Sequence, residues 1–250
     1  MKRAAAISII FFFAIMAFPV ASFSDQDPKA LLENALKAPA GIHAIYEAKR
    51  YHEGKLDTLK LEFRSDLVNN QSARSWKIIE PADLKGISII SVGNTRFALR
   101  KKPDWEFGEV KPSKLNKRFA GMETTLHDLA FAWLGDAELS FVGTSLINGY
   151  TCNIIEARKK KGAKATLPIV RFYIRENENY LAKLEVQNKK HRTLRTLDFF
   201  DWENVDGRSI FKKMEVFDEK TRTRTVLTRI SAETGSQPSD SFAPAFSATR

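Results

Sequence analysis

Apolar and polar residues alternate with a period of two along much of the chain, which is the pattern of half-buried β-strands. In the clearest case Leu59, Leu61 and Phe63 alternate with charged residues. Similar alternation recurs in residues 42–49, 170–174, 184–186, 194–199, 210–216 and 221–230. Turn sequences such as Asp206-Gly207 separate these segments. About ten short strands at this spacing predict one antiparallel sheet, strongly curved or rolled, rather than βαβ units.

Two segments depart from this alternation and predict helices. Asp27-Pro28 precedes an apolar run with helical spacing, and Asp favours the N-cap while Pro favours the first helical position. Thr125 and Asp128 resemble a capping box in front of an apolar stripe, which predicts a helix over residues 124–134. We expect this second helix to cover the sheet as a lid.

The first residues have the three regions of a secretory signal peptide. Lys2 and Arg3 form a basic head, residues 4–18 are apolar, and residues 20–22 are small. The apolar run is shorter than the roughly 20 residues of a spanning helix. The sequence thus predicts a cleaved signal over residues 1–24 without a cysteine for lipidation, and one domain over residues 25–250. Residues 231–250 are rich in Ser, Pro and Ala and are expected to be a partly flexible tail, of which Phe242 and Phe246 could dock on the domain.

Charge and cysteine usage narrow the class of protein. The formal net charge is +10, and +8 once Lys2 and Arg3 are removed. In an exported chain this balance favours anionic lipid headgroups or an acidic partner over nucleic acid. The single cysteine, Cys152, allows no intramolecular disulfide and is expected to be a buried core thiol in a monomer.

A search for catalytic chemistry yields little. The four histidines are not spaced as metal ligands, and no nucleophile elbow, phosphate-binding loop or calcium loop occurs. Asp198 with its acidic neighbours Asp201, Glu203 and Asp206 fits solvated charges better than an acid/base cluster. The sequence therefore predicts no enzyme and no metal or other cofactor.

Basic runs adjoin several predicted turns. There are three such runs: residues 100–102, a segment with Lys159, Lys160 and Lys161, and a segment with Lys189 and Lys190. Such runs are either solvated loops or parts of a patch for anionic headgroups or an acidic partner protein. Aromatic residues such as Phe97 and Trp105 flank one polar segment, where they either pack the core or line a cavity for an acyl chain.

Three motifs in the middle of the chain add a family resemblance. Residues 80–86, residues 119–123 with the following helix, and residues 149–155 occur in the order found in the LolA-like family of outer-membrane lipoprotein-sorting proteins, which the chain resembles. Residues 206–210, 223–230 and 238–242 are similar to later steps of the same pattern. Where many members have a Tyr-Leu-Pro segment before an Arg-rich stretch, this chain has residues 98–105, so no lipid-contacting residue is carried over.

The resemblance implies a half-open antiparallel β-barrel, plugged by helices, in the periplasm of a double-membraned bacterium. It also implies a carrier that shields the acyl chains of lipoproteins or other lipids, working with an inner-membrane transporter and an outer-membrane acceptor. The alternative is a sensor or interaction module that acts with a membrane partner. Alternation and aromatic clustering select the candidates for a lipid cavity: Leu59, Leu61, Phe63, Ile89, Phe97, Leu99, Trp105, Leu129 and Trp133.

Overall fold

The computed structural model describes residues 27–37, 39–93, 96–102, 104–130, 132, 137–160, 169–237 and 242. The predicted signal peptide, residues 1–24, lies outside these ranges. Within them, no helix is long and apolar enough to cross a membrane.

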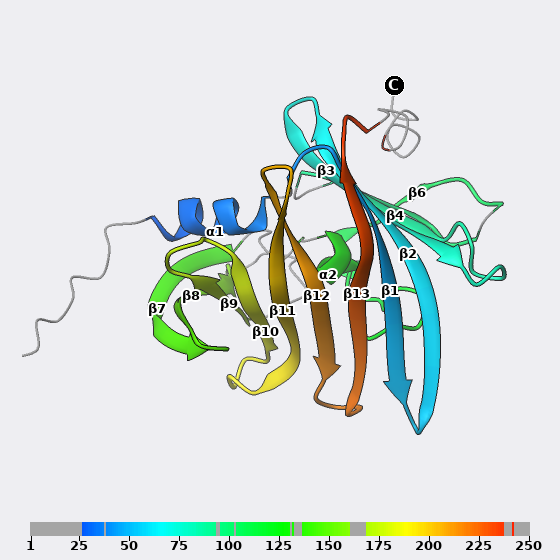
Figure 1. Ribbon diagram of the computed structural model, residues 1–250. Coiled ribbons are helices and arrows are strands. Elements are labelled where there is room, and N and C mark those ends of the chain that lie inside the picture. Colours follow the sequence, from blue (N-terminus) through cyan, green and yellow to red (C-terminus); the bar gives the residue numbers. More distant parts are fainter. Residues whose placement is uncertain are drawn as a thin grey trace, which may run out of the picture.

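The described chain is mostly β-strand, with three short helical segments (Figure 1). The helical segments are α1 (Pro28–Leu36), η1 (Pro112–Lys114) and α2 (Leu126–Ala130). The strands are β1 (Ile42–His52), β2 (Lys55–Val68), β3 (Gln71–Glu80), β4 (Ser88–Val92), β5 (Arg96–Arg100), β6 (Gly108–Glu109), β7 (Ala137–Ile147), β8 (Tyr150–Lys159), β9 (Ile169–Arg175), β10 (Leu181–Gln187), β11 (Thr193–Val205), β12 (Arg208–Asp218) and β13 (Thr223–Thr234).

All thirteen strands belong to one sheet in which every neighbouring pair is antiparallel. The order is β6-β5-β4-β3-β2-β1-β13-β12-β11-β10-β9-β8-β7. Two meanders, β1 to β6 and β7 to β13, are therefore joined where the first strand pairs with the last. The sheet curves strongly but does not close on itself, which confirms the predicted incomplete antiparallel barrel (Figure 1).

Tight turns explain why the strands form successive hairpins. Asp206 and Gly207 connect β11 to β12 with φ of 48° and 79°, and Asn148 and Gly149 connect β7 to β8 with φ of 49° and 84°. Two consecutive residues with positive φ produce the turn whose twist matches that of paired strands, and Asn, Asp and Gly adopt this conformation most easily. These local signals are the ones expected from the sequence.

Helix α1 begins where the sequence predicts. The Asp27 side chain accepts a hydrogen bond from the Lys29 backbone N–H at 3.0 Å, and Pro28 is the first helical residue. Leu31, Leu32 and the last residue of the helix, Leu36, are buried. The helix thus presents one apolar face to the sheet and packs near β7 and β9 (Figure 1).

Helix α2 is shorter than the predicted helix of residues 124–134 in the part that the structure describes. It spans five residues, and residues 131 and 133–136, including Trp133, lie outside the described ranges. The predicted capping box is present, because the Asp128 carboxylate accepts hydrogen bonds from the Thr125 backbone N–H at 2.7 Å and hydroxyl at 2.8 Å. Figure 1 shows α2 on the concave side of the sheet.

The C-terminal end differs in part from the expected tail. Strand β13 continues to Thr234, because residues from Ile42 to Ile45 on β1 pair with it as far as that residue. Of the two phenylalanines that could dock, Phe242 is buried against Ala73, Ile90 and Val92, and Phe246 lies outside the described residues. The first four residues of the predicted tail are thus part of the sheet.

Candidate functional site

The concave face of the sheet gathers most of the predicted cavity residues. Leu59, Leu61, Phe63, Ile89, Phe97 and Leu129 are buried in one hydrophobic cluster, and Leu99 packs against it while remaining partly exposed. Four cross-strand pairs place a single row across this face: Ala44, Phe63, Trp76, Ile89 and Leu99. Three of the predicted residues thus lie in register on adjacent or nearby strands.

Trp105 does not belong to this cluster. Its side chain is 49% exposed, and the Lys102 ammonium lies 5.0 Å from the centre of its ring. The indole follows a polar segment beyond β5 and forms a cation–π contact at the surface. Trp105 thus lies apart from the buried cluster, and Trp133 falls outside the described residues.

Aromatic residues from both halves of the chain meet at the centre of the concave face. The ring of Tyr46 lies 5.3 Å from the rings of both Trp76 and Phe211, and Phe63 lies 4.6 Å from Trp76. The Tyr46 hydroxyl donates to the Phe211 carbonyl at 3.0 Å, and burial raises the pKa of Tyr46. The sequence analysis missed Tyr46 and Phe211 as site residues, although both lie in alternating segments.

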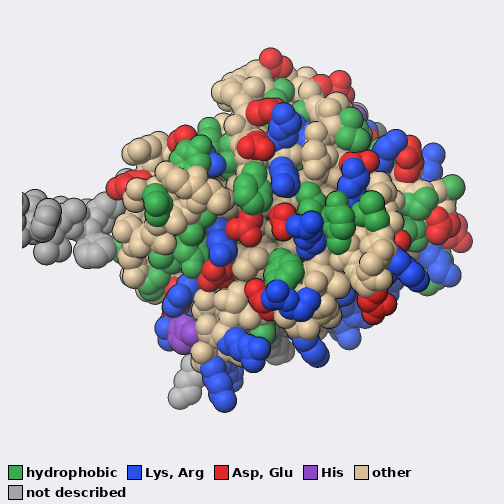
Figure 2. All heavy atoms as spheres, turned by 60° about the horizontal axis from the view of Figure 1, so that its bottom comes forward, with side chains coloured by type: hydrophobic (Ala, Val, Ile, Leu, Met, Phe, Trp, Pro, Cys, Tyr) green, Lys and Arg blue, Asp and Glu red, His purple; other side chains and the backbone are tan. Residues whose placement is uncertain are grey.

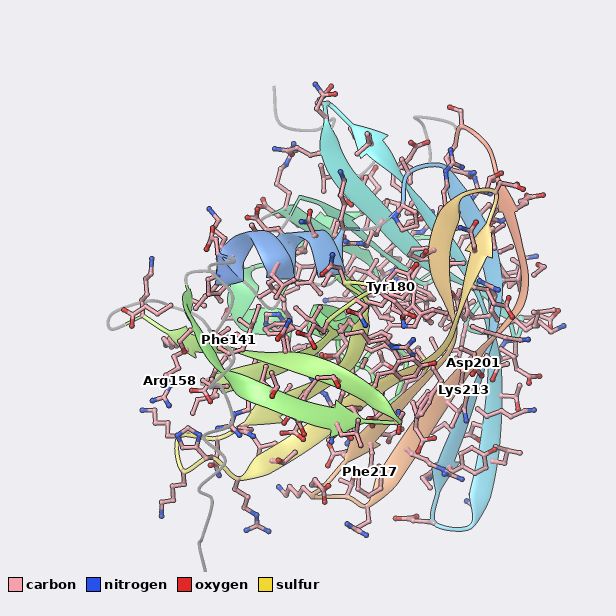
Figure 3. All side chains as sticks on the ribbon, turned by 60° about the vertical axis from the view of Figure 1, so that its left-hand side comes forward. Phe141, Arg158, Tyr180, Asp201, Lys213 and Phe217 are labelled. Carbon is pink, nitrogen blue, oxygen red and sulfur yellow. The ribbon has the colours of Figure 1, made fainter. Side chains whose placement is uncertain are left out.

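The aromatic group continues towards β11. Trp202 stacks on Tyr180 with ring centroids 4.8 Å apart, and it also contacts Phe199 and Phe211 edge-on or tilted. Figure 3 labels Tyr180 and turns the side of the molecule with β7 and β8 towards the viewer. The Trp202 indole nitrogen is buried and has no hydrogen-bond partner among the described residues. One unused donor therefore lies inside an otherwise apolar group.

The cover of the concave face is fixed to β11 through Asp128. The Arg195 guanidinium donates to the Asp128 carboxylate at 2.8 Å, and both side chains are largely buried. The neighbouring His127 is also buried, and its pKa is lowered mainly by burial, which Asp128 partly opposes. The ion pair between Arg195 and Asp128 thus helps to hold α2 to β11.

A second buried carboxylate ties the segment before α2 to β13 and β1. Glu123 accepts hydrogen bonds from the Thr223 and Thr225 hydroxyls at 2.9 and 2.7 Å. Its carboxylate also lies 3.4 Å from Arg50 and Arg118 nitrogens. The cover is therefore attached near the middle of the sheet, where the two meanders meet.

Arg74 joins both helices to β3 from within the core. Its guanidinium donates to the Leu36 carbonyl at the end of α1 and, at 3.4 Å, to the Ala130 carbonyl at the end of α2. Burial lowers the pKa of Arg74 to about 10. The Trp76 indole adds a further bond to α2, donating to the Leu129 carbonyl at 3.1 Å.

The structure separates the acidic residues around Asp198. Glu203 pairs with Lys212 and Arg229, and Asp206 accepts a hydrogen bond from Thr234. Asp198 instead lies opposite Glu215 on β12. In the described part of the chain, no three His, Cys, Asp or Glu side chains are grouped as metal ligands. Cys152 is buried, as predicted, and burial raises its pKa.

The basic runs have different positions in the sheet. Lys159 and Lys160 stand at the exposed end of β8, and Lys189 and Lys190 are exposed in the turn between β10 and β11. Lys161 lies outside the described residues. The third run is on and after β5, in the other half of the strand order, where the Arg100 guanidinium donates to the Gly86 carbonyl at 2.9 Å.

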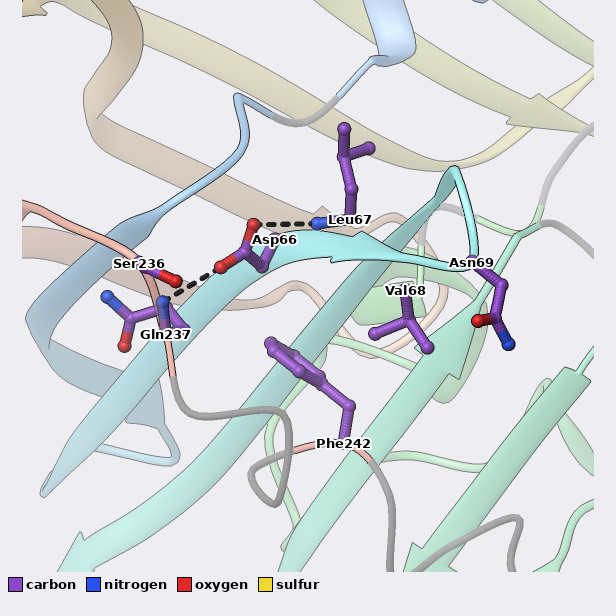
Figure 4. A pocket seen from close by; sticks show the side chains of 7 residues that line it. All are labelled: Asp66, Leu67, Val68, Asn69, Ser236, Gln237 and Phe242. Carbon is purple, nitrogen blue, oxygen red and sulfur yellow. Dashed lines mark hydrogen bonds between the residues drawn. The ribbon is translucent and has the colours of Figure 1, made fainter.

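A separate pocket of about 520 Å³ lies between the end of β2 and the chain after β13 (Figure 4). Its described lining consists of Asp66, Leu67, Val68, Asn69, Ser236, Gln237 and Phe242. The Asp66 carboxylate accepts from the Gln237 backbone N–H at 2.8 Å and so fastens the C-terminal segment across the hairpin. This pocket is mixed in polarity and contains none of the predicted cavity residues.

An open, curved antiparallel sheet with an apolar concave face and a short helical cover defines a class of half-barrel proteins. A protein-family profile described as "Uncharacterized protein" matches residues 73–246. The chain belongs to this family. No protein with a curated description matches the sequence.

Solved structures of other proteins share the fold, and three of them are compared with the chain below. A DUF1329 family protein from Desulfovibrio piger has a TM-score of 0.73 at 17% identity, over 90% of this chain and 100% of that one. A putative outer membrane lipoprotein-sorting protein domain from Vibrio parahaemolyticus has a TM-score of 0.73 at 14% identity, over 86% and 97%. A LolA superfamily protein from Nitrosomonas europaea has a TM-score of 0.67 at 17% identity, over 87% and 97%.

Proposed function

We propose that the protein is a periplasmic carrier for the acyl chains of lipoproteins or other lipids. The observation that carries the proposal is the apolar concave face, which is covered by the short helices rather than by a second sheet. The predicted signal peptide supports export. The names of two relatives with the same fold, a lipoprotein-sorting domain and a LolA superfamily protein, support the class of cargo.

The energetics of the cover suit a protein that opens for its cargo. Burial of an acyl chain stabilises the complex by about 0.8 kcal/mol per CH₂, or about 12 kcal/mol for about fifteen CH₂ groups. The cover is held by contacts of Arg74, Glu123, Asp128 and Trp76, and each buried hydrogen bond contributes about 1–3 kcal/mol. The gain from an entering chain therefore exceeds the contribution of several of these hydrogen bonds, and the apolar side chains of the cover can pack on the bound chain in place of the sheet.

A carrier also needs a donor and an acceptor. In the proposed cycle an inner-membrane transporter loads the protein and an outer-membrane acceptor unloads it. Without cargo the helices shield the aromatic group around Tyr46 and Trp76 from water, so the empty protein can diffuse without exposing that surface. The proposed role involves no chemical step.

Native mass spectrometry of protein purified from membrane-containing cells tests this function. We expect the folded protein to retain phospholipid or acylated peptide as discrete added masses. Protein that stays empty, even after incubation with a synthetic acylated peptide, would contradict the carrier role and favour a binding or sensor module.

A charged substitution in the row tests the position of the cargo. Leu99→Asp places a carboxylate at the partly exposed end of the row that runs from Ala44 to Leu99. We expect this variant to lose the bound lipid masses in native mass spectrometry, because a charge is costly beside an acyl chain. Leu146→Asp is the matched control, since Leu146 is 70% exposed on β7. Both variants should retain β-rich circular dichroism, and equal cargo retention by the two would refute the assignment of the row.

A further inference from the structure

The two basic runs of β8 and of the β10–β11 turn form one surface. An Arg158 Nη2 and an Arg171 Nη2 lie 3.5 Å from the two ring nitrogens of His191, which stands in the turn. Residues more than 30 positions apart in the chain are thus joined around one imidazole. We call this surface the basic end, and its members are Arg158, Lys159, Lys160, Arg171, Lys189, Lys190, His191 and Arg192.

Only one carboxylate pairs with the basic end in the part of the chain that the structure describes. Glu156 is 1% exposed and accepts from Arg158 and Arg171 at 2.5 and 2.8 Å. It also lies 3.9 Å from His191. Glu138 and Glu185 lie opposite Arg158 and Arg171 on the neighbouring strands. With Glu156 they make three carboxylates against seven Lys and Arg side chains, which leaves a local excess of four positive charges when His191 is neutral.

The imidazole cannot satisfy both guanidinium groups. A neutral His accepts a hydrogen bond at only one ring nitrogen, and a protonated His accepts none. At least one of the Nη2 groups of Arg158 and Arg171 therefore faces an N–H donor rather than an acceptor. An external anion with several oxygen acceptors would bridge these donors, and a phosphate group has that chemistry.

The shape of the basic end favours an extended surface over a small molecule. Lys159 and Lys160 are exposed at the end of β8, and Lys189, Lys190 and Arg192 are exposed in the β10–β11 turn. Arg158, labelled in Figure 3, projects from the margin of the sheet. Figure 2 brings the lower end of the sheet forward and shows Lys and Arg side chains gathered along its lower margin. Small-molecule sites are concave, whereas an exposed array of cations matches many headgroups at once.

We propose that the basic end binds the phosphate groups of an anionic phospholipid surface and so docks the protein on a membrane. This inference goes beyond the carrier function, because surface binding does not require that the concave face takes up an acyl chain. The cover of the concave face is held by other side chains, namely Arg74, Glu123 and Asp128. Failure of the docking proposal would leave the cargo experiment unaffected, and the reverse also holds.

Vesicle flotation tests the proposal on the mature chain. We expect the protein to bind vesicles of phosphatidylcholine mixed with phosphatidylglycerol and not vesicles of phosphatidylcholine alone. Binding should be lost between about 0.15 M and about 1 M salt, where the Debye length falls from about 8 to about 3 Å. Equal binding to both vesicle types, or binding that persists at high salt, would overturn the proposal.

A matched pair of variants locates the binding surface. Lys189→Gln with Lys190→Gln should weaken vesicle binding roughly 25-fold, since each surface cation contributes a factor of about five. Lys37→Gln with Lys85→Gln removes the same charge from exposed positions elsewhere and should have little effect. Equal losses in the two pairs would show a general charge effect and contradict a specific surface.

Inorganic phosphate and an acidic peptide serve as competing ligands. Calorimetric binding of either one, without binding to the anionic vesicles, would replace the membrane surface by a small-phosphate or protein site and overturn the proposal. Circular dichroism of each variant should match that of the wild type, because all four lysines are exposed.

Discussion

At the scale of single residues, the buried polar groups on the concave side of the sheet differ in whether they have hydrogen-bond partners. Glu123 and Asp128 are buried, but each has several partners, so both act as anchors for the cover. Trp202 differs, because its buried indole N–H has no partner among the described residues. A buried donor without an acceptor is unfavourable and is compatible with a ligand that supplies one.

Trp202→Phe is expected to reduce affinity for an acyl ester by up to about tenfold, which corresponds to one neutral hydrogen bond of about 0.5–1.5 kcal/mol. Fluorescence titration with a fatty-acid ester would measure the effect. A hydrocarbon probe of the same length without a carbonyl serves as control and should bind both proteins equally. The same loss for both probes would show that Trp202 contributes packing alone.

Asp198→Asn is expected to stabilise the protein at neutral pH by less than about 1 kcal/mol. Burial raises the pKa of Asp198, and Glu215 and Glu185 add to this effect against Lys183. A carboxyl with a raised folded-state pKa favours folding at low pH and opposes it above the unfolded value. Urea unfolding should therefore show a gain at pH 7 that disappears well below pH 3.8, and a loss at pH 7 would contradict the pKa direction.

At the scale of elements, the helices are attached to the sheet by few side chains. Arg74 contacts the ends of both α1 and α2, whereas the strands are held by continuous ladders. Helices of nine and five residues have little intrinsic stability in water, so these contacts and apolar packing decide whether they stay in place.

Arg74→Met keeps an unbranched side chain but removes the donors to the two helix ends. We expect the free energy of local opening of α1 and α2 to fall by about 1–3 kcal/mol, so that their amide hydrogens exchange faster. Exchange in β11 to β13 should change little. Lys77→Met, on the other face of the same strand, is the control and should leave exchange in both helices unchanged. Uniform acceleration over the whole sheet would instead indicate global destabilisation.

At the scale of the whole molecule, carboxylates paired with cations make stability depend on pH. Burial raises the pKa of Glu156, Glu62 and Glu185, but hydrogen bonds from neighbouring Arg or Lys side chains outweigh it, so the net pKa of each is lowered. A carboxyl with a lowered folded-state pKa stabilises the fold above the unfolded value near 4.5 and loses that contribution as the pH falls through the folded value.

The free energy of unfolding is therefore expected to be steady near neutral pH and to fall below about pH 4.5. Urea midpoints measured down the pH scale would show this decline. Glu156→Gln should be less stable than the wild type at pH 7 and approach it in acid, because the protonated wild-type side chain loses the same ion pairs. A constant difference at all pH values would assign its effect to packing.

Much of the fold could be predicted because strand and turn signals are local. The alternation of Leu59, Leu61 and Phe63 and the Asp206-Gly207 turn indicated strand and hairpin without any knowledge of the partners. Strand β4 shows the limit, since all five of its residues are buried and its sequence has no alternation. A strand buried on both faces cannot be recognised by period alone.

The candidate site was predicted less completely. Alternation marked Leu61 as a residue of a buried face, and its side chain is buried, whereas aromatic clustering in the sequence did not reveal that Trp105 is 49% exposed. Tyr46 and Phe211 were missed as site residues because they are 165 positions apart and meet only through the pairing of β1, β13 and β12.

The amino-acid sequence by itself determined the local elements of this protein: two capped helices, a series of hairpins and a basic, cysteine-poor chain. Only the tertiary structure decided which surfaces these elements form, namely the aromatic group of the concave face, the anchors of the cover and the basic end around His191. The physical reason is the separation along the chain of the residues that interact. Caps, turns and alternation depend on neighbouring residues, whereas β1 pairing with β13 and Arg158 meeting His191 depend on the register of distant strands.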